Sequence, residues 1–250
     1  MSPSPDDLEA PGANAPGEAC AARGAPTQPS VPGRAGEAVP DAPGTRNAAG
    51  APDDYAALDP RARDVLDFWF GAPADPAFGH ARKQWFNGGE AFDAQIRERY
   101  GALVGAATAG ALDAWAQRPL GALAVILVLD QFSRNIHRGT PLAYASDRHA
   151  LAHAKALVAS GGDRALPTGH HRAFAYLPFE HDESLDSQRE AVRLCAQIKH
   201  EAGCSDYYDH ALRHAAVVER FGRFPHRNAI LGRPSTDGEI SFLKTPGSSF

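Results

Sequence analysis

The sequence predicts an all-α fold of about eight to ten helices, preceded by a disordered N-terminal extension. From residue 55 onward, apolar side chains recur at helical spacing, and no stretch sustains the alternation expected of a strand. Residues 1–54 hold half of the prolines and almost no large apolar side chains, so they cannot bury enough surface to offset the entropy of ordering them. We therefore expect a single helical domain over residues 55–250.

The composition of the chain argues against several classes of protein. The formal net charge of −5 disfavours a general nucleic-acid-binding surface. Three cysteines without a Cys-x-x-Cys pair are too few for a structural zinc site and do not indicate a disulfide framework. The longest strongly apolar run, Leu120 to Leu129, is far shorter than the ~20 residues that span a bilayer. We expect a soluble, cytoplasmic protein with neither nucleic acid nor a membrane as its partner.

Local signals place the first helices. Asp59 and Pro60 form a cap and first-turn pair for a helix that Gly71 ends. The next long helix is expected from about residue 90 to 108, because apolar residues recur there at every fourth position, at Phe92, Ile96, Tyr100 and Val104.

The most apolar helix opens at Pro119, and it should lie at the centre of the domain because apolar residues surround it. It ends in the polar run Asp130-Gln131-Phe132-Ser133-Arg134-Asn135. Buried polar groups must find partners, so Asp130 and Arg134 are candidate ligand-binding residues. The structural alternative is an i,i+4 ion pair between these two residues, with Asn135 capping the helix.

A helix expected over residues 141–159 carries His149 and His153 at i,i+4 spacing, which could hold a metal ion. These histidines project from the face opposite the apolar stripe of the helix, however, and no carboxylate lies between them. We therefore expect both side chains to be solvated, and we predict no metal site there.

The run Phe179-Glu180-His181-Asp182-Glu183 directly follows Pro178. Three carboxylates beside an imidazole are typical of an acid/base or metal-binding set. The last two carboxylates could instead favour the positive start of the following helix. That alternative leaves Glu180 and His181 unexplained, so we take both as candidate catalytic residues in a turn after Pro178.

Two amphipathic helices are expected over about residues 185–201 and 205–221. The main apolar stripe of the second is predicted to comprise Tyr208, Ala211, Leu212 and Ala215. His210 and His214 lie on another stripe that leads to Phe221 and the segment after it. His214 is therefore a candidate ligand-binding residue, although a buried histidine is more often a core residue with satisfied hydrogen bonds. A capping box over residues 236–239 predicts one last short helix.

The segment Glu219 to Arg233 joins large apolar residues to a group of hydrogen-bond donors. Gly222 can end one helix in a left-handed conformation, and Pro225 can open the next. Between them and just beyond lie the polar candidates Arg223, His226, Arg227 and Asn228. Arginine offers a planar fork of donors, so this group suits a carboxylate or a phosphate. The alternative is that the arginines only satisfy the last carbonyls of neighbouring helices.

Four segments resemble the bacterial domain-of-unknown-function family 924: Leu129 to Phe132, Tyr176 to His181, Arg220 to Arg233, and Pro246 to Phe250. The similarity covers about residues 60 to 250. The resemblance implies an all-α fold like that of the tetratricopeptide superfamily, and it implies no activity. Ser133 stands where the family usually has proline, and Asp182 stands where serine is common, but neither change affects a candidate site residue.

The leading hypothesis is a small-molecule site at the junction of three segments. In this hypothesis Arg223 and Arg227 hold an anionic group. Glu180, with His181 or His226, moves a proton. The remaining ligand-binding candidates are Asp130, Arg134, His214 and Asn228.

Two alternatives remain open. A metal-assisted site would use Glu180, His181, His214 and His226 as ligands. We disfavour a metal because Glu180 and His181 would diverge by ~100° on a helix, and the sequence names no cofactor. The other alternative is a tetratricopeptide-like interaction module without catalytic activity. The expected partner is thus a small anionic molecule or a peptide.

Overall fold

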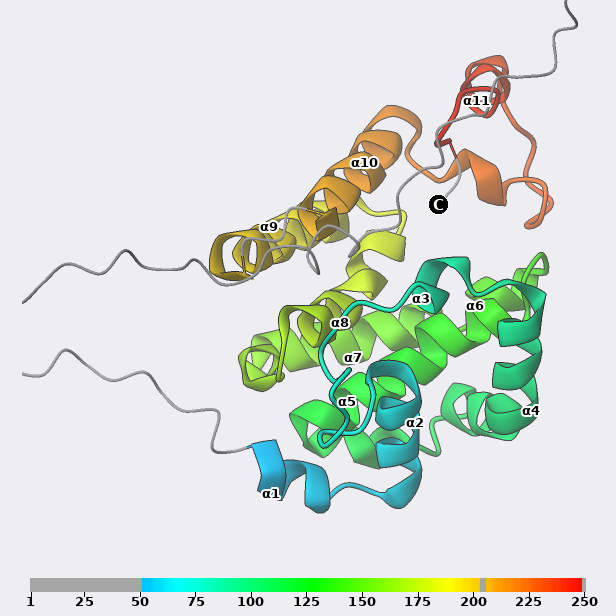
Figure 1. Cartoon of the computed structure of the whole chain (residues 1–250). Coiled ribbons are helices and arrows are strands. Elements are labelled where there is room, and N and C mark those ends of the chain that lie inside the picture. Colours follow the sequence, from blue (N-terminus) through cyan, green and yellow to red (C-terminus); the bar gives the residue numbers. More distant parts are fainter. Residues whose placement is uncertain (1–50, 203–205, 249–250) are drawn as a thin grey trace, which may run out of the picture.

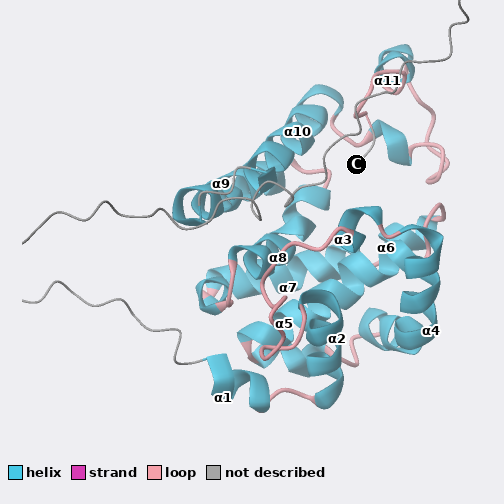
Figure 2. Ribbon diagram, viewed as in Figure 1, coloured by secondary structure: helices cyan, strands magenta, loops and turns pink. Residues whose placement is uncertain are grey.

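The computed structural model describes residues 51–202 and 206–248, and every regular element within them is a helix (Figure 1, Figure 2). The α-helices are α1 (Ala51–Ala56), α2 (Pro60–Phe70), α3 (Gln84–Asn87), α4 (Gly89–Thr108), α5 (Pro119–Ile126), α6 (Ser133–Ile136), α7 (Asp147–Ala159), α8 (Gly169–His181), α9 (Leu185–Ala202), α10 (Asp206–Phe221) and α11 (Asp237–Phe242). The other helical segments are η2 (Asp113–Gln117), η3 (Leu127–Phe132), η4 (Pro141–Tyr144), η5 (Gly162–Ala165) and η6 (Pro225–Arg227). The all-α prediction is confirmed.

The start of the helical domain differs from the prediction. Residues 1–50 of the predicted extension lie outside the described residues. Helix α1 begins at Ala51, whereas the folded part was expected to begin near residue 55.

Several helix ends are stabilised by the capping residues from which they were predicted. Asp59 Oδ1 accepts a backbone N–H of the first turn of α2 at 2.8 Å, Pro60 occupies the first position, and Gly71 (φ 89°) follows the last. Thr236 and Glu239 form the predicted capping box of α11. These ends are confirmed because a few neighbouring residues satisfy the unpaired backbone groups by themselves.

The central helix is continuous over residues 119–136, but its winding changes along the way. Between α5 and α6, the segment η3 is a π-helix, in which the N–H of Ser133 donates to the carbonyl of Val128, five residues earlier. The wider turn rotates Asp130 and the residues after it relative to their places in a regular α-helix. Residues 120–132 are all buried, as predicted.

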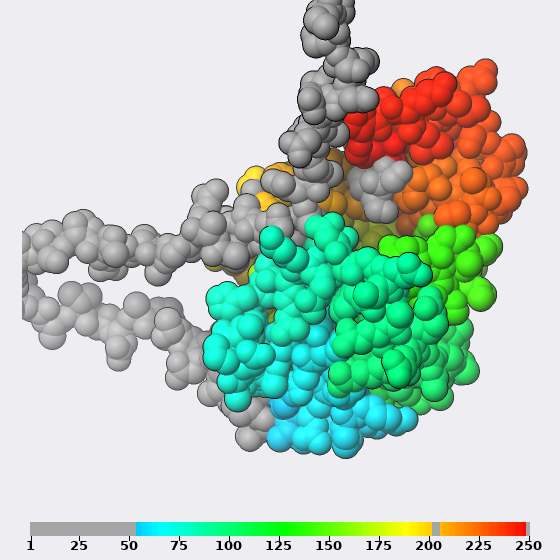
Figure 3. Space-filling model, turned by 45° about the vertical axis from the view of Figure 1, so that its right-hand side comes forward, coloured from blue at the N-terminus to red at the C-terminus, as the bar shows by residue number. Residues whose placement is uncertain are grey.

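The main core surrounds this helix. Helices α2, α7 and α8 pack against α5, and α4 packs against η3 and α6, while α9 packs on α8 and α10 on α9. A second, smaller core at the C-terminal end consists of Val217, Val218 and Phe224, with Phe221 and Phe242 packed against it. The C-terminal residues, orange to red, rest against green residues of the main body (Figure 3). No helix in the described ranges is both long and apolar enough to cross a membrane.

Pro178 does not end its helix. Helix α8 continues through it to His181, because a proline this near the C-terminus removes only one hydrogen bond and packing against α9 holds the last turn. The turn expected after Pro178 is therefore wrong. Glu180 and His181 leave the same helical turn about 100° apart, so they meet different neighbours.

The inward face of α10 also differs from the prediction. Leu212 is 42% exposed, whereas His214 and Val217 are buried. The helix expected over residues 141–159 is divided into η4 and α7, since the chain turns before Asp147 begins the second element. This division places the start of α7 next to the end of the central helix.

The contact between α5 and η2 yields a test of the packing. A Cβ atom at Gly121 would lie 2.0 Å from the carbonyl oxygen of Trp115, so the backbone would have to move. We expect Gly121→Ala to lower the free energy of unfolding by about 1–3 kcal/mol. In α4, a Cβ at Gly105 would meet nothing within 4 Å, and Gly105→Ala should stabilise the protein by roughly 0.5–1 kcal/mol. Urea unfolding measures both changes, and stabilisation by both variants would contradict the close approach.

Candidate functional site

A cavity of about 250 Å³ lies where the end of the central helix, η4, α8, α10 and η6 meet. Its polar lining consists of Gln131, Arg134, Asn135, Arg138, Tyr144, Glu180, His181, Tyr207, His210, His214, His226 and Arg227. Aromatic and aliphatic side chains, among them Trp85, Phe86 and Leu177, complete the wall. A concave site with converging polar groups and an apolar backing is the usual form of a small-molecule pocket.

Asp130 lies behind the cavity wall and is 1% exposed. Its Oδ1 accepts a hydrogen bond from His181 Nδ1 at 2.7 Å and lies 2.9 Å from Arg134 Nη1, and its Oδ2 accepts from Gln131 at 2.6 Å. Burial alone would raise the pKa of this carboxyl, but the charge of Arg134 and the hydrogen bonds from His181 and Gln131 hold it below its usual range. Asp130 is therefore a buried carboxylate that fixes the imidazole of His181.

The hydrogen bond to Asp130 determines the tautomer of His181. Because Nδ1 carries the proton donated to the carboxylate, the lone pair of the neutral ring is on Nε2. Burial, followed by the charge of Arg134, lowers the pKa of His181. Near pH 7 this residue is a neutral imidazole with a proton-accepting nitrogen.

Glu180 leaves α8 toward α9 and α10. Its Oε1 accepts a weak hydrogen bond from the Cys195 thiol at 3.5 Å, and its Oε2 lies 3.5 Å from His214 Nδ1. Burial raises the pKa of Glu180 to about 8, so this carboxyl carries a proton near pH 7. Burial also raises the pKa of Cys195, which remains a thiol.

The other histidines of the cavity are neutral as well. His214 Nδ1 donates to the backbone carbonyl of His210 at 3.0 Å, which leaves Nε2 of His214 as the acceptor nitrogen. Burial lowers the pKa of His214 well below its usual value, and it lowers the pKa values of His210 and His226 to about 4. The cavity thus combines one protonated carboxyl with several unprotonated imidazoles.

Arg227 adds a positive charge to the lining of the cavity and is 6% exposed. Its guanidinium carbon lies 4.8 Å from the ring centre of Tyr144 and 4.5 Å from that of Phe224. The carboxylate of Asp147 lies 3.6 Å from it but makes bidentate hydrogen bonds, of 2.9 and 3.1 Å, to Arg134. Among the described residues, Arg227 Nε has no hydrogen-bond partner. A buried donor of this kind suits an oxygen of an anionic ligand.

Six of the nine residues predicted from the sequence line this cavity, namely Arg134, Glu180, His181, His214, His226 and Arg227. Asp130 supports them from behind through its bond to His181. Five of them lie at or near helix ends that converge on one side of the domain, and His214 projects toward the same space from the middle of α10.

Arg223 and Asn228 lie outside the lining. Arg223 binds the carboxylate of Glu239 through Nε at 2.6 Å and Nη2 at 2.9 Å, which anchors α11. Asn228 is fully buried and donates to Ser235 Oγ at 3.0 Å. The structure gives both residues a part in holding the C-terminal segment rather than a place at the cavity.

Several lining or supporting residues were missed from the sequence, chiefly Tyr144, Asp147 and Tyr207. Asp147 begins α7, so its position resembled an ordinary acidic residue at a helix start. His210 was placed on the same stripe as His214 but was not named as a site residue, and it also lines the cavity. The tyrosines carried no sequence signal that separates a cavity wall from a core.

Two groups of described side chains have ligand atoms close enough together to hold a metal ion. The group in the cavity comprises Glu180, His210 and His214. The group outside the cavity comprises Asp113, His149 and His153. A metal in the cavity would require Glu180 to lose its proton, which its raised pKa opposes near pH 7.

Comparison with known proteins gives a family but no chemistry. Residues 65–247 match the family described as "Bacterial protein of unknown function (DUF924)". A similar solved structure is that of the protein of unknown function ATU0120 from Agrobacterium tumefaciens, with a TM-score of 0.63 and 38% sequence identity over 74% of this chain and 97% of that chain. No curated protein matches the sequence.

The raised pKa of Glu180 makes the stability depend on pH. The pKa of Glu180 is 4.5 in the unfolded chain and about 8 in the folded protein. The protonated carboxyl therefore contributes its full stabilisation below pH 4.5, and this contribution is lost as the pH rises through about 8. Glu180→Gln keeps the shape of the protonated carboxyl but does not titrate. We expect the variant to gain stability relative to the parent between about pH 5 and pH 9, on the order of a few kcal/mol.

Urea unfolding of parent and variant across this pH range measures the difference. Glu219→Gln, at an exposed position of α10, is the matched control and should show no such trend. A stability difference between parent and Glu180→Gln that is independent of pH would contradict the burial of a protonated carboxyl.

Proposed function

We propose that this chain, which belongs to the DUF924 family, binds a small anionic molecule in the cavity and transfers a proton to or from it by general acid/base catalysis. The observation that carries the proposal is the juxtaposition of three features in one cavity. These are the protonated carboxyl of Glu180, the hydrogen-bonded pair of Asp130 and His181, and the buried guanidinium of Arg227.

Arg227 is the proposed anchor for the anionic group. Burial and the nearby charge of Arg134 lower the pKa of Arg227, which means that its positive charge is held at a cost in the free protein. A carboxylate or phosphate oxygen at Nε would satisfy the buried donor and reduce the repulsion between the two guanidinium groups. The rings of Tyr144 and Phe224 keep the guanidinium plane in place for such a ligand.

The pKa values of Glu180 and His181 shift in opposite directions, and this difference indicates which residue is the acid and which is the base. Glu180 is the proposed acid because it carries a proton near pH 7, and His181 is the proposed base because its Nε2 is unprotonated. Asp130 would hold the ring in this tautomer and stabilise the imidazolium that forms. The thiol of Cys195 is poorly suited as a nucleophile because its pKa is raised. Proton transfer at an atom near the anionic group is therefore the reaction class that fits best.

The rival from another class is a tetratricopeptide-like interaction module that binds a peptide. Such a module presents side chains from successive helices along an open groove, and a likeness of fold would support it only by analogy. Here the distinctive polar residues converge on one small cavity, most of them from helix ends, with His210 and His214 from one face of α10. This convergence favours the small-molecule site.

The anion anchor can be tested with Arg227→Lys. If the guanidinium of Arg227 serves to bind a ligand, replacing it with an ammonium group should leave the melting temperature of the free protein unchanged or raise it. Phosphate or sulfate should raise the melting temperature of the parent by more than that of the variant, because the anion binds the folded state. Thermal denaturation at matched ionic strength measures both effects.

Arg223→Lys is the matched control, because Arg223 lies in the same segment but binds Glu239. It should lower the melting temperature and keep the response to anions. A destabilised Arg227→Lys, together with a parent that shows no anion-specific shift, would assign Arg227 a structural role only.

Proton linkage tests whether a bound anion is coupled to a titratable group of the cavity, the imidazole of His226. Bound phosphate would raise the lowered pKa of His226, about 4 in the free protein, so binding near pH 5 to 6 should take up protons. Calorimetric titration in two buffers of different ionisation enthalpy measures this uptake. We expect uptake in the parent and less of it in His226→Gln, and phosphate binding without proton uptake would leave a passive anion site.

A further inference from the structure

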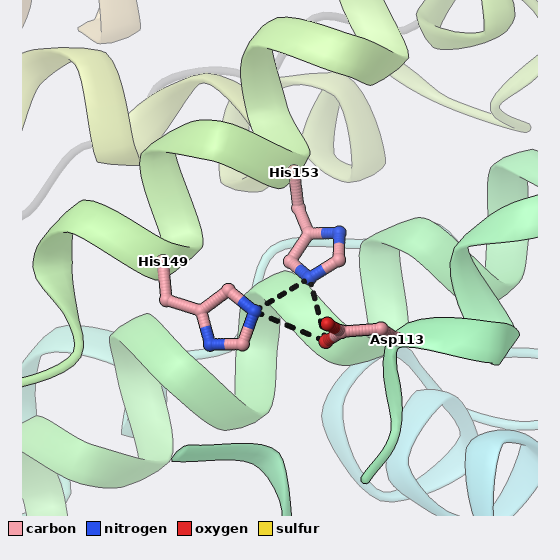
Figure 4. Close-up of side chains that lie close together, drawn as sticks. All are labelled: Asp113, His149 and His153. Carbon is pink, nitrogen blue, oxygen red and sulfur yellow. Dashed lines mark hydrogen bonds and ion pairs between the residues drawn. The ribbon is translucent and has the colours of Figure 1, made fainter. Parts of the chain in front are cut away.

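A second cluster of side chains lies outside the cavity, where η2 meets α7. Asp113 is the first residue of η2, and His149 and His153 are one helical turn apart on α7. All three side chains point toward one spot between these elements (Figure 4). From the sequence, both histidines were expected to be solvated, because they lie opposite the apolar stripe and no carboxylate lies between them. In the fold both are partly buried, and η2 supplies a carboxylate.

The three facing atoms form a nearly equilateral triangle. Asp113 Oδ1 lies 3.0 Å from His149 Nε2 and 3.1 Å from His153 Nε2, and the two nitrogens are 3.2 Å apart. Ligand atoms bound to a zinc ion at about 2.05 Å are separated by about 3.3 Å in a tetrahedral site and about 2.9 Å in an octahedral one. An ion about 1 Å out of the plane of this triangle would therefore reach all three atoms with almost no rearrangement.

Hydrogen bonds cannot satisfy all three contacts at once. Each neutral imidazole has at most one proton on its Nε2, and the carboxylate has none. If both Nε2 atoms donate to Asp113, then the short contact between His149 and His153 is left without a hydrogen bond. If one of them donates to the other ring instead, a lone pair faces the carboxylate oxygen. A cation satisfies the three lone pairs together.

The surroundings hold this arrangement in place and leave it open to solvent. Thr108 Oγ1, at the end of α4, lies 3.1 Å from Ser146 Oγ, just before α7, and Asp113 N–H donates to the carbonyl of Gly110 at 3.3 Å. These contacts fix the chain around η2 relative to α7. The side chain of Asp113 is 49% exposed, so an ion can enter and water can fill its remaining coordination positions.

We propose that Asp113, His149 and His153 form a binding site for a divalent transition-metal ion of the zinc class. Two imidazole nitrogens and one carboxylate oxygen suit zinc, cobalt or nickel, whereas magnesium and calcium prefer oxygen ligands throughout. The ion ties η2 to α7 and thereby stabilises the fold. This site is independent of the proposed chemistry in the cavity, since none of its three residues lines that cavity.

The test uses the full chain, prepared without a histidine tag and stripped of metal by a chelator. Zinc is titrated against a chromogenic chelator, and cobalt binding is followed by its visible absorption. We expect one ion per chain at this site and a higher melting temperature with zinc than with magnesium. Asp113→Asn and His153→Ala should each weaken zinc binding by about tenfold or more, because each removes a ligand.

Two further variants locate the ion. His200→Ala, at an exposed position of α9, controls for nonspecific surface histidines and should bind zinc like the parent. Circular dichroism of the metal-free variants checks that each is folded, which is expected because Asp113 is exposed and His153 is partly exposed. Absence of zinc binding, or binding that survives both Asp113→Asn and His153→Ala, overturns the proposal. Loss of binding in His210→Ala alone would also overturn it, because the ion would then belong to the cavity group.

Discussion

The buried carboxylate of Asp130 is the constraint from which the arrangement of the cavity follows. A negative charge that is 1% exposed needs strong donors, and Asp130 finds them in Arg134 and in His181 from another helix. Arg134 in turn binds Asp147 at the start of α7, and Asp147 lies 3.6 Å from Arg227. Alternating charges thus join the central helix, α7, α8 and η6. Loss of Arg134 would leave Asp130 buried without its cationic partner.

Helix ends that depend on neighbouring residues were predictable from the sequence, as Asp59 and Gly71 show. The π-turn at Asp130 was not, because a segment that is apolar on all sides has no periodicity to mark a change of winding. The inward face of α10 was mispredicted for a related reason. Leu212 was assigned to the main apolar stripe but lies at the surface, whereas His214, assigned to a second stripe, is buried at the polar cavity.

Which candidate residues share the cavity depends on partners that are distant in sequence. Arg223 and Arg227 look alike in the sequence, yet Glu239, 16 residues away, holds only the first of them. Asp113 lies 40 residues before His153, so the carboxylate beside the histidine pair could not be seen in local spacing. Polar residues gathered at helix ends indicated the region of the cavity, and the tertiary fold decided which of them face it.

The small C-terminal core has a consequence for how molecules reach the cavity. Three buried apolar residues and two partly buried ones hold the segment that carries Arg227, and an ion pair between Arg233 and Glu183 docks it onto the end of α8. A unit with so few apolar contacts opens at a lower free energy than the main core. Undocking of this unit would expose one wall of the cavity while the rest of the domain stays folded. A ligand bound to Arg227 would then stabilise the docked state of this unit, and it would slow amide hydrogen exchange in the C-terminal segment.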